Sequence, residues 1–235
     1  IMQRAKLRPD QKQRAKTLIS RIVAGGLSKY NPHDALPDLP QGHRILVPGQ
    51  VEDDASILAG TGAISTNESL LHATRNANPD AVIIYKTHPD VAAGLRAGQT
   101  DATPFADLVL TQGDPAKLIA CVDEVWTMTS LLGFETLLRG KKVVTVGAPF
   151  YAGWGLTEDR GRIPPRRNLA VSLETLVHAT LIDYPRYFDP VTKQPCPVEV
   201  VIERLVSGTL PRHGPFNRTL SKLQGVFASQ SHLWR

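Results

Sequence analysis

Small, polar or titratable residues occur in groups at four points of the sequence, and each group directly follows a short apolar run. The four segments are GQVEDDAS (49–56), KTHPD (86–90), TSLLGFE (129–135) and GAPFYAGWG (147–155). Ligands of an open parallel sheet bind beyond the carboxyl ends of its strands, where small, polar and titratable residues are expected. One polar strand end is ordinary, whereas four in succession indicate a single composite site.

Two of these segments carry groups suited to an anionic ligand. Thr129 and Ser130 precede an apolar stretch. The N-terminus of a helix there would offer free N–H groups and a partial positive charge to a phosphate, although simple capping by Ser and Thr is the alternative. His88, which precedes Pro89, could neutralise a leaving phosphate or act as an acid. Lys86 adds positive charge two residues earlier.

Acidic residues follow the first apolar run as Glu52, Asp53 and Asp54. Glycosyl transfer passes through an oxocarbenium-like state, which a carboxylate can stabilise or trap covalently. Crowded acids also raise one another's pKa, which suits a base. A solvent-exposed turn or a helix N-cap is the structural alternative, and the local residues do not choose among the three. Glu135 could accept hydrogen bonds from ribose hydroxyls or be an ordinary helix-surface acid.

The fourth segment combines glycines with aromatic residues. Gly147, Gly153 and Gly155 would let the backbone approach a ligand closely, and Tyr151 and Trp154 could stack on a sugar or a base. The alternative is a tight loop whose aromatic rings cap the core. The sequence contains no GxGxxG fingerprint, P-loop, GxSxG or HExxH motif, and it shows no cluster of metal ligands.

The apolar runs that position these segments predict a parallel sheet. Buried strands are expected at 44–48, 81–85, 124–128 and 142–146. Helices are expected at 9–24, 67–78, 115–121, 130–139, 172–182, 197–206 and 217–230. Short buried strands that alternate with helices predict an α/β fold, a Rossmann-like parallel sheet with helices on both faces.

Composition indicates a soluble globular protein. Of the 235 residues, 42% are hydrophobic and 21% are charged, which suffices for a buried core. No apolar run reaches membrane-spanning length. Cys121 and Cys196 stand alone, and isolated cysteines are more often reduced, which favours the cytoplasm.

The net charge of +5 has a large contribution from the N-terminus. Residues 1–21 contain a single acid, Asp10, and seven basic residues: Arg4, Lys6, Arg8, Lys12, Arg14, Lys16 and Arg21. A solvated helix face explains them most simply, and contact with nucleic acid, anionic lipid or an acidic partner is the alternative. Nucleic-acid binding also calls for aromatic residues among the charges, and none precedes Tyr30.

Longer motifs resemble the KpsC/LipA family of capsule polysaccharide biosynthesis proteins. The matching stretches are SKYN (28–31), GQVEDDASI (49–57), YKTHPDV (85–91), DEVWTMTSLLGFETLLRGKKV (123–143), GAPFYAGWGLTED (147–159) and YPRYFDPVT (184–192). The resemblance covers most of residues 28–195. It implies a β-transferase of 3-deoxy-manno-octulosonate (Kdo), which uses CMP-Kdo as donor and needs no further cofactor. The implied acceptor is a lipid-linked oligo-Kdo glycan.

The same resemblance implies a GT-B architecture, of which this chain would be the C-terminal, nucleotide-sugar-binding half. Residues 1–43 would form a basic helix and linker, 44–210 the Rossmann-like donor-binding domain, and 211–235 a helix that packs back or reaches the other half. The N-terminal half of the same module would be a partner. The implied location is cytoplasmic and peripheral at the inner face of the inner membrane, and the isolated chain is expected to be inactive.

Site residues carry over position by position. The family's pattern at the first strand end shares Gln50, Asp54 and Ser56, which implies Asp54 as the nucleophile of a retaining transfer with Glu52 and Asp53 as neighbours. Gly49 stands where that pattern has an acid. A looser resemblance to sialyltransferases, whose His-Pro and Ser/Thr pairs hold the CMP phosphate, maps onto His88-Pro89 and Thr129-Ser130. The remaining donor contacts are expected at Lys86, Glu135, Gly147, Tyr151, Gly153 and Trp154.

Two other classes of function fit parts of the sequence. An epimerase or hydrolase of a nucleotide sugar would use the same phosphate-binding groups. A non-catalytic docking module would use the basic N-terminal helix to contact a membrane or partner.

Overall fold

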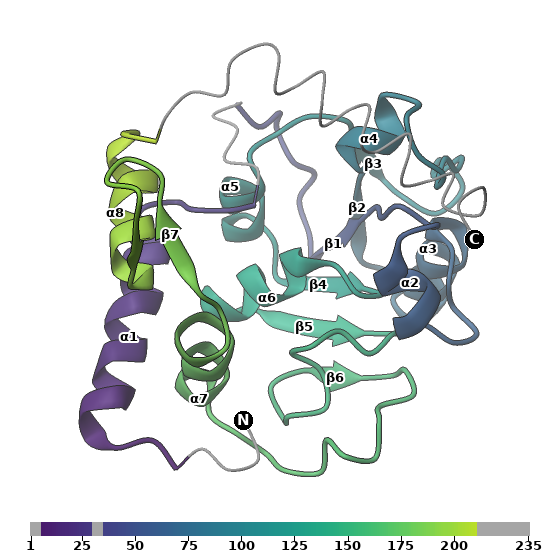
Figure 1. Cartoon of the computed structure of the whole chain (residues 1–235). Helices are drawn as coiled ribbons and strands as arrows, with labels where there is room; N and C mark the ends of the chain where they lie inside the picture. Colours follow the sequence, from purple (N-terminus) through teal and green to yellow (C-terminus); the bar gives the residue numbers. More distant parts are fainter. Residues whose placement is uncertain (1–5, 30–34, 211–235) are drawn as a thin grey trace, which may run out of the picture. The chain divides into compact units, whose positions relative to one another are not determined.

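The computed structural model describes residues 6–29 and 35–210, and its central feature is a six-stranded parallel sheet. The strands are β1 (Arg44–Pro48), β2 (Val82–Lys86), β3 (Leu108–Leu110), β4 (Glu124–Thr127), β5 (Lys142–Thr145) and β6 (Glu158–Asp159). Their order in the sheet is β3-β2-β1-β4-β5-β6, and every neighbouring pair is parallel (Figure 1). This is the strand order of a doubly wound Rossmann sheet, in which the order of successive strands runs one way from β1 to β3 and the other way from β4 to β6. The predicted α/β fold is confirmed.

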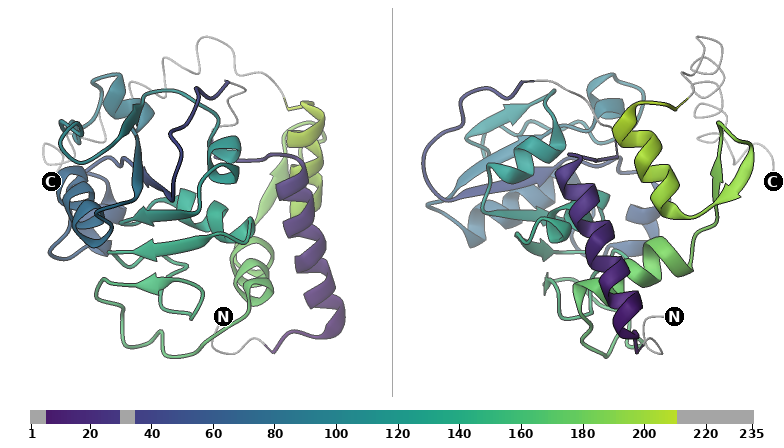
Figure 2. Two further views of the ribbon diagram at one scale, coloured as in Figure 1. Left: turned by 180° about the vertical axis from the view of Figure 1, so that it is seen from behind. Right: turned by 90° about the vertical axis from the view of Figure 1, so that its left-hand side faces the viewer.

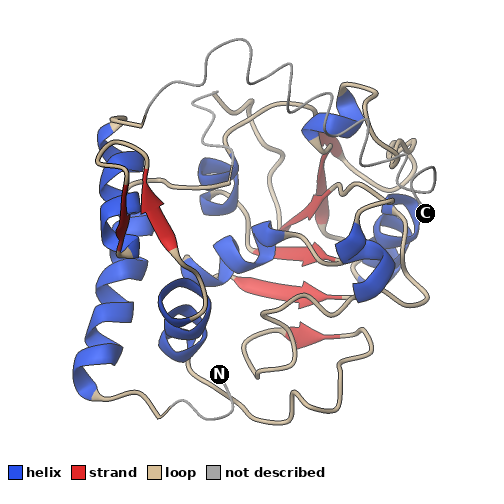
Figure 3. Ribbon diagram, viewed as in Figure 1, coloured by secondary structure: helices blue, strands red, loops and turns tan. Residues whose placement is uncertain are grey.

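Helices cover the sheet and connect its strands (Figure 3). They are α1 (Pro9–Ala24), α2 (Ala55–Gly60), α3 (Asn67–Ala77), α4 (Pro89–Ala92), α5 (Pro115–Ala120), α6 (Leu131–Leu138) and α7 (Leu173–Val177), which continues as the π-helix His178–Asp183. Among the described helices, none is long and apolar enough to cross a membrane.

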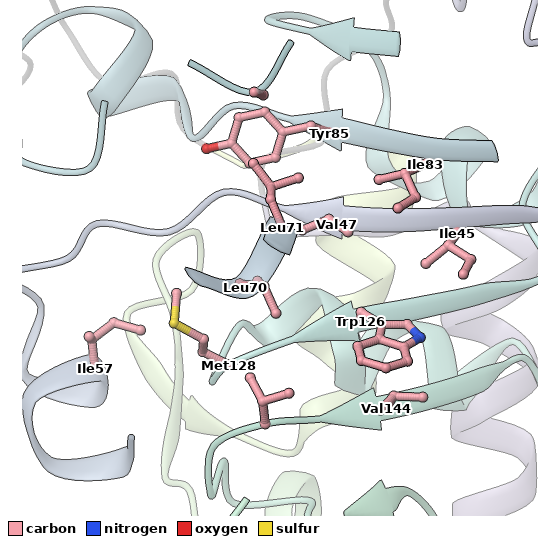
Figure 4. Packing of buried hydrophobic residues seen from close by; sticks show 12 residues of the cluster. Ile45, Val47, Ile57, Leu70, Leu71, Ile83, Tyr85, Trp126, Met128 and Val144 are labelled. Carbon is pink, nitrogen blue, oxygen red and sulfur yellow. The ribbon is translucent and has the colours of Figure 1, made fainter. Parts of the chain in front are cut away.

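The core lies on both faces of the sheet because neighbouring strand residues point to opposite sides. On one face, Ile45, Ile83, Trp126 and Val144 pack with the side chains of α3 (Figure 4). On the other face, the neighbouring residues of the same strands pack against α5. That cluster includes Leu46, Ile84 and Val125 of the strands and Leu118 and Ile119 of α5. All of these side chains are fully buried or nearly so. Because both faces of the sheet are covered, its strands have continuous apolar runs and lack the alternation of apolar and polar residues that a half-exposed sheet shows.

The N-terminal helix α1 packs beside α7 (Figure 2). Its apolar stripe, Ala15, Leu18 and Ile22, is buried. Basic residues at other positions of the helix, such as Lys12 and Lys16, are exposed. The amphipathic pattern thus produces an ordinary surface helix whose charged side faces solvent.

The predicted strands and helices lie within a few residues of those observed, with six short additions. Sequence patterns missed α2, α4, β3 and β6, which have six, four, three and two residues, and two three-residue strands at Tyr187–Asp189 and Gln194–Cys196. Elements this short carry too few residues for a period to emerge. The expected helix at 172–182 is α7 followed by the π-helix. The helix expected at 217–230, like the whole of 211–235, lies outside the described residues.

The chain divides into two compact units, residues 1–185 and 186–235. The described part of the second unit has the hairpin β7 (Tyr187–Asp189) and β8 (Gln194–Cys196) followed by α8 (Val198–Ser207). Asp189, 2% exposed, accepts bonds from the Val191 amide and the Thr192 hydroxyl and pairs with Arg204 at 3.0 Å. These partners hold the pKa of Asp189 low, at about 2. The YFDPVT motif therefore anchors this hairpin to α8.

Candidate functional site

A cavity of about 420 Å³ lies at the carboxyl ends of β1, β2 and β4, at the point where the strand order reverses. Nine of the residues predicted from sequence line it: Gln50, Asp54, Ser56, Lys86, His88, Pro89, Thr129, Ser130 and Glu135. They come from three separate polar segments, which the parallel topology brings together. Predicted residues from three of the four segments therefore share one hollow in the first unit, and their role in binding stays a prediction.

Asp54 is the N-cap of α2 and lies at the cavity wall. Its Oδ1 accepts a bond from the Ser56 amide at 2.8 Å. Hydrogen bonding from Ser56, with a smaller contribution from the Arg96 and Lys29 charges, lowers the pKa of Asp54. The carboxylate is therefore ionised at neutral pH. The N-cap alternative is correct locally, and it leaves an anionic oxygen-bearing group on the cavity.

The other two acids of this segment lie outside the cavity lining, among the described residues. Glu52 accepts a bond from the Asn67 amide at 2.7 Å, at the start of α3. Asp53 pairs with Arg96 at 3.0 Å. The resemblance implied that both support Asp54. The structure shows one acid fixing a helix start and the other fixing an arginine.

Gln50 joins the end of β1 to the loop after β4. Its Oε1 accepts bonds from the Thr127 hydroxyl and the Met128 and Thr129 amides, at 3.0, 3.2 and 3.0 Å. Its Nε2 donates to the Thr129 hydroxyl at 2.9 Å. The Thr129 hydroxyl in turn donates to Ser56 at 3.2 Å. Because these bonds engage both ends of the amide, Gln50 positions the site more than it offers groups to a ligand.

The Thr129-Ser130 pair opens α6, as expected for a phosphate-binding helix end. Ser130 is the N-cap, and its Oγ accepts from the Leu132 amide at 3.2 Å. The buried Tyr151 hydroxyl donates to the Ser130 carbonyl from the opposite side. Burial raises the pKa of Tyr151, so this donor keeps its proton. The helix start is thus held from both the β1 side and the glycine-rich loop.

His88 caps α4 and is partly buried at the cavity, its side chain 17% exposed. Its Nδ1 accepts a bond from the Asp90 amide at 3.2 Å. The neutral imidazole therefore carries its proton on Nε2. Burial lowers the pKa of His88, and the Lys29 and Arg96 charges lower it further against the effect of Asp90. At neutral pH the ring is an uncharged N–H donor.

Glu135 faces the cavity from α6 but already has partners. It is 7% exposed and accepts a bond from the Lys29 amide at 2.9 Å. Burial raises its pKa. Glu135 therefore holds the Ser28-Lys29 segment against the cavity, since both of these residues also line it. A contact with ribose hydroxyls stays a prediction.

Four predicted donor contacts lie outside the lining of the cavity: Gly147, Tyr151, Gly153 and Trp154. The Tyr151 and Trp154 side chains are 0% and 6% exposed. The Gly153 amide donates to Asp159 at 2.9 Å. Arg167 ties this loop together by donating to its carbonyls, including that of Ala152 at 2.9 Å. The structure thus gives these residues a packing role, and direct donor contact by them stays a prediction.

Among the cavity residues that sequence patterns missed are Lys29, Arg96 and Phe150. Arg96 comes from a connecting segment where nothing in the local pattern marks a ligand, whereas Lys29 belongs to the SKYN stretch, whose family match could have pointed to it. Phe150 belongs to the glycine-rich loop and is 39% exposed, and the centroid of its ring lies 5.1 Å from that of Phe134. An aromatic residue in that loop was expected to stack on a ligand, but which of three rings faces the cavity depends on how the loop packs.

The lining mixes three cations, Lys29, Lys86 and Arg96, with the acids Asp54, Asp90 and Glu135 and the neutral His88. Such a mixture suits a ligand that combines negative groups with a reacting centre that becomes positive. Within the described part of the chain, no group of three His, Cys, Asp or Glu side chains is arranged to hold a metal ion.

Comparison with known proteins finds relatives that, by their names, act on bacterial surface polysaccharides. A sequence model of the family described as "Capsule polysaccharide biosynthesis protein" matches residues 4–187. The capsule polysaccharide modification protein LipA of Neisseria meningitidis serogroup B is 41% identical over 97% of this chain and 34% of its own length. The lipopolysaccharide-processing protein LpsZ of Rhizobium meliloti is 47% identical over 74% of this chain and 41% of its own.

Solved structures agree with the sequence relatives. The β-Kdo 2,7 transferase of Thermosulfurimonas dismutans KpsC matches with a TM-score of 0.74 and 37% identity, over 87% of this chain and 64% of that one. The KpsC β-Kdo 2,4 transferase of the same organism matches with a TM-score of 0.78 and 32% identity, over 85% and 64%. The chain spans about a third of the length of LipA. It belongs to the capsule polysaccharide biosynthesis family that includes KpsC and LipA.

Proposed function

We propose that this chain carries the donor site of a glycosyltransferase that moves Kdo from CMP-Kdo to a lipid-linked oligo-Kdo acceptor with retention of configuration. The observation that carries the proposal is the shared cavity of Asp54, His88 and the Thr129-Ser130 helix end. The solved relatives named as β-Kdo transferases support the choice of sugar.

The charges of the site suit departure of a nucleotide. His88 would donate its Nε2 proton in a hydrogen bond to the CMP phosphate, and the N–H groups at the start of α6 would face the same anion. Lys86 at the end of β2 adds a positive charge to the same wall. Together these groups stabilise the charge that the leaving phosphate gains as its bond to the sugar breaks.

Asp54 would act at the anomeric carbon. Its carboxylate oxygen forms a bond to this carbon while the carbon–oxygen bond to CMP breaks and its electron pair leaves with the phosphate. The acceptor hydroxyl then forms its bond to the carbon, loses its proton to a base and releases Asp54. Two displacements retain the configuration. The low pKa of Asp54 keeps the attacking group ionised and makes it a good leaving group in the second step.

The test is Asp54→Ala in the longer protein that contains this chain, assayed for Kdo transfer to an oligo-Kdo lipid. A loss of at least about 1,000-fold in kcat is expected when a nucleophile is removed. Asp101→Ala is a matched control, because Asp101 is exposed, accepts a bond from the Thr103 amide and lies outside this cavity. Near-normal transfer by Asp54→Ala would rule out the assignment.

A parallel incubation separates transfer from the other nucleotide-sugar reactions. Product that appears from CMP-Kdo only when the lipid acceptor is present indicates a transferase. Equal consumption of CMP-Kdo without acceptor indicates a hydrolase or epimerase and contradicts the proposal. We expect this chain alone to bind CMP-Kdo without transferring it, since half of a GT-B cleft positions one reactant.

The acceptor's lipid implies that the protein works at the cytoplasmic face of the inner membrane, and we include this location in the proposal. The exposed basic residues of α1 would face the anionic surface, because the apolar stripe of the helix is used against α7. Undiminished binding to anionic liposomes after charge reversal of Lys6, Arg8 and Lys12 would count against α1 as the contact.

A further inference from the structure

Arg96 is a cavity cation for which the steps above give no role. It lies in the segment between α4 and β3, whereas Lys86 lies at the end of β2 and Lys29 follows α1. Its side chain is 28% exposed and donates from Nε and Nη2 to one oxygen of Asp53, at 3.2 and 3.0 Å. Nη1 takes no part in this pair. Asp53 therefore orients the guanidinium of Arg96, and the N–H groups of Arg96 that Asp53 does not use can donate to a ligand in the cavity.

The backbone on both sides of Arg96 is fixed to the strand end that carries Asp54. The Glu52 amide donates to the Ala97 carbonyl at 3.1 Å. The buried Asn67 amide nitrogen donates to both the Gly98 and Gln50 carbonyls at 2.8 Å. Gly98 has φ +128°, and a Cβ there would lie 2.6 Å from the Gln50 carbonyl oxygen. The glycine permits this close approach, which places Arg96 beside the strand end.

Arg96 lines the same cavity as Asp54, the group assigned to the anomeric carbon, and His88, the group assigned to the leaving phosphate. In agreement with this shared position, the charge of Arg96 contributes to lowering the pKa of both groups.

We propose that Arg96 binds the carboxylate of the donor's sugar acid, and this inference rests on the proposed function. In a 2-ulosonic acid such as Kdo, the carboxylate is bonded directly to the anomeric carbon. A cation beside the group that attacks this carbon therefore meets the carboxylate. Arg96 also offsets the repulsion between that carboxylate and the ionised Asp54, which would otherwise oppose their approach.

Arginine suits this role better than the lysines of the same wall. Its planar guanidinium presents several donors to the two oxygens of a carboxylate, whereas a lysine offers a compact point charge. Lys86 at the end of β2 is the competing candidate for the same group. A donor without the carboxylate would offer no anion to the Arg96 donors that Asp53 does not use, so the arginine would also select against neutral sugars.

The experiment compares two donors by calorimetry with the whole chain: CMP-Kdo and its analogue in which a carboxamide replaces the carboxylate. The wild type should bind CMP-Kdo about 10- to 100-fold more tightly than the carboxamide, as expected for a charge-assisted contact. Arg96→Gln should reduce this preference to less than about threefold while its affinity for CMP alone stays nearly unchanged. Arg96→Lys should keep an intermediate preference.

Arg162→Gln is the matched control, because Arg162 is exposed in the same unit and lies outside the cavity. It should bind all three ligands as the wild type does. A preference for the carboxylate that persists in Arg96→Gln overturns the inference, and its loss in Lys86→Gln instead assigns the carboxylate to Lys86. Equal weakening of CMP and CMP-Kdo by Arg96→Gln assigns Arg96 to the phosphate and also overturns it. Failure of wild-type protein to bind CMP contradicts the proposed function itself.

Discussion

Asp54 and His88 both have lowered pKa values, for different reasons and with opposite results. Hydrogen bonding from Ser56 stabilises the charged form of Asp54, whereas burial disfavours the charged form of His88. Near neutral pH, Asp54 is therefore an anion and His88 is an uncharged donor. A nucleophile and a phosphate-binding group need these protonation states, and two neighbouring strand ends provide them.

The lowered pKa of His88 predicts how donor affinity depends on pH. A bound phosphodiester stabilises the imidazolium, so binding raises the pKa of His88 and takes up a proton as pH falls. The affinity for CMP-Kdo should be flat from about pH 8 to pH 7 and should rise below the ordinary histidine value of about 6.5. Calorimetry across this range measures it. His88→Gln should give a flat profile, and the same rise in that variant would assign the proton to another group.

Gln50 is predicted to matter through the loop that it holds. Gln50→Leu leaves the Met128 and Thr129 amides and the Thr127 hydroxyl without their acceptor, and should lower the free energy of unfolding by about 2–4 kcal/mol. Gln50→Glu keeps the accepting oxygen and should cost less. Denaturant unfolding measures both, and equal losses would show that the hydrogen bonds of Oε1 are not the cause.

At the level of elements, the start of α6 depends on a close contact with the glycine-rich loop. A Cβ at Gly133 would lie 2.2 Å from the Tyr151 hydroxyl oxygen, the same hydroxyl that donates to the Ser130 carbonyl. The ring lies between the loop and the helix, in contact with Phe134 and Phe150. The loop therefore sets where the phosphate-binding helix end lies, although Tyr151 itself does not reach the cavity.

Gly133→Ala should accordingly displace the helix end. We expect a loss of at least about 2 kcal/mol in the free energy of unfolding, as for other overpacked sites, and weaker binding of CMP. Tyr151→Phe removes the clashing oxygen and should recover part of the loss in the double variant, giving a coupling of about 0.5–3 kcal/mol. Unfolding and CMP titration of the four proteins measure it, and strictly additive effects would contradict the contact.

Sequence patterns predicted the elements that have strong apolar runs and failed where packing decides. The strand at 44–48 is predicted with its observed bounds because its buried residues Ile45, Leu46, Val47 and Pro48 form an apolar run that stops at Gly49. The two-residue strand β6 has the sequence Glu158-Asp159 and gives no such signal. Likewise, His88 and Ser130 could be predicted as site residues from their place after a strand. The position of Arg96 depends on a buried asparagine 29 residues earlier in the chain, a contact with no local pattern.

At the level of the whole molecule, one unit contains the entire cavity. All of its lining residues lie between Ser28 and Phe150, within residues 1–185. The second unit has its own anchor in Asp189 and Arg204. The family's motifs therefore divide into those that build the site and one, YFDPVT, that stabilises a separate hairpin. Binding and stability can accordingly be measured separately in the two units.

A nucleotide that binds this cavity should stabilise the first unit alone. Binding to the folded state adds about 2.7 kcal/mol when the ligand is present at 100 times its Kd. Hydrogen exchange should therefore slow in the core of the sheet, for example at the amides of Ile83 and Val144, when CMP is added. The Val191 amide of the second unit should exchange at its original rate, since its acceptor Asp189 belongs to the hairpin. Arg204→Gln should speed exchange at Val191 without changing the response of the sheet to CMP. Protection that spreads equally to both units would show that the hairpin takes part in the site, and the donor site would then need residues beyond those at the sheet's edge.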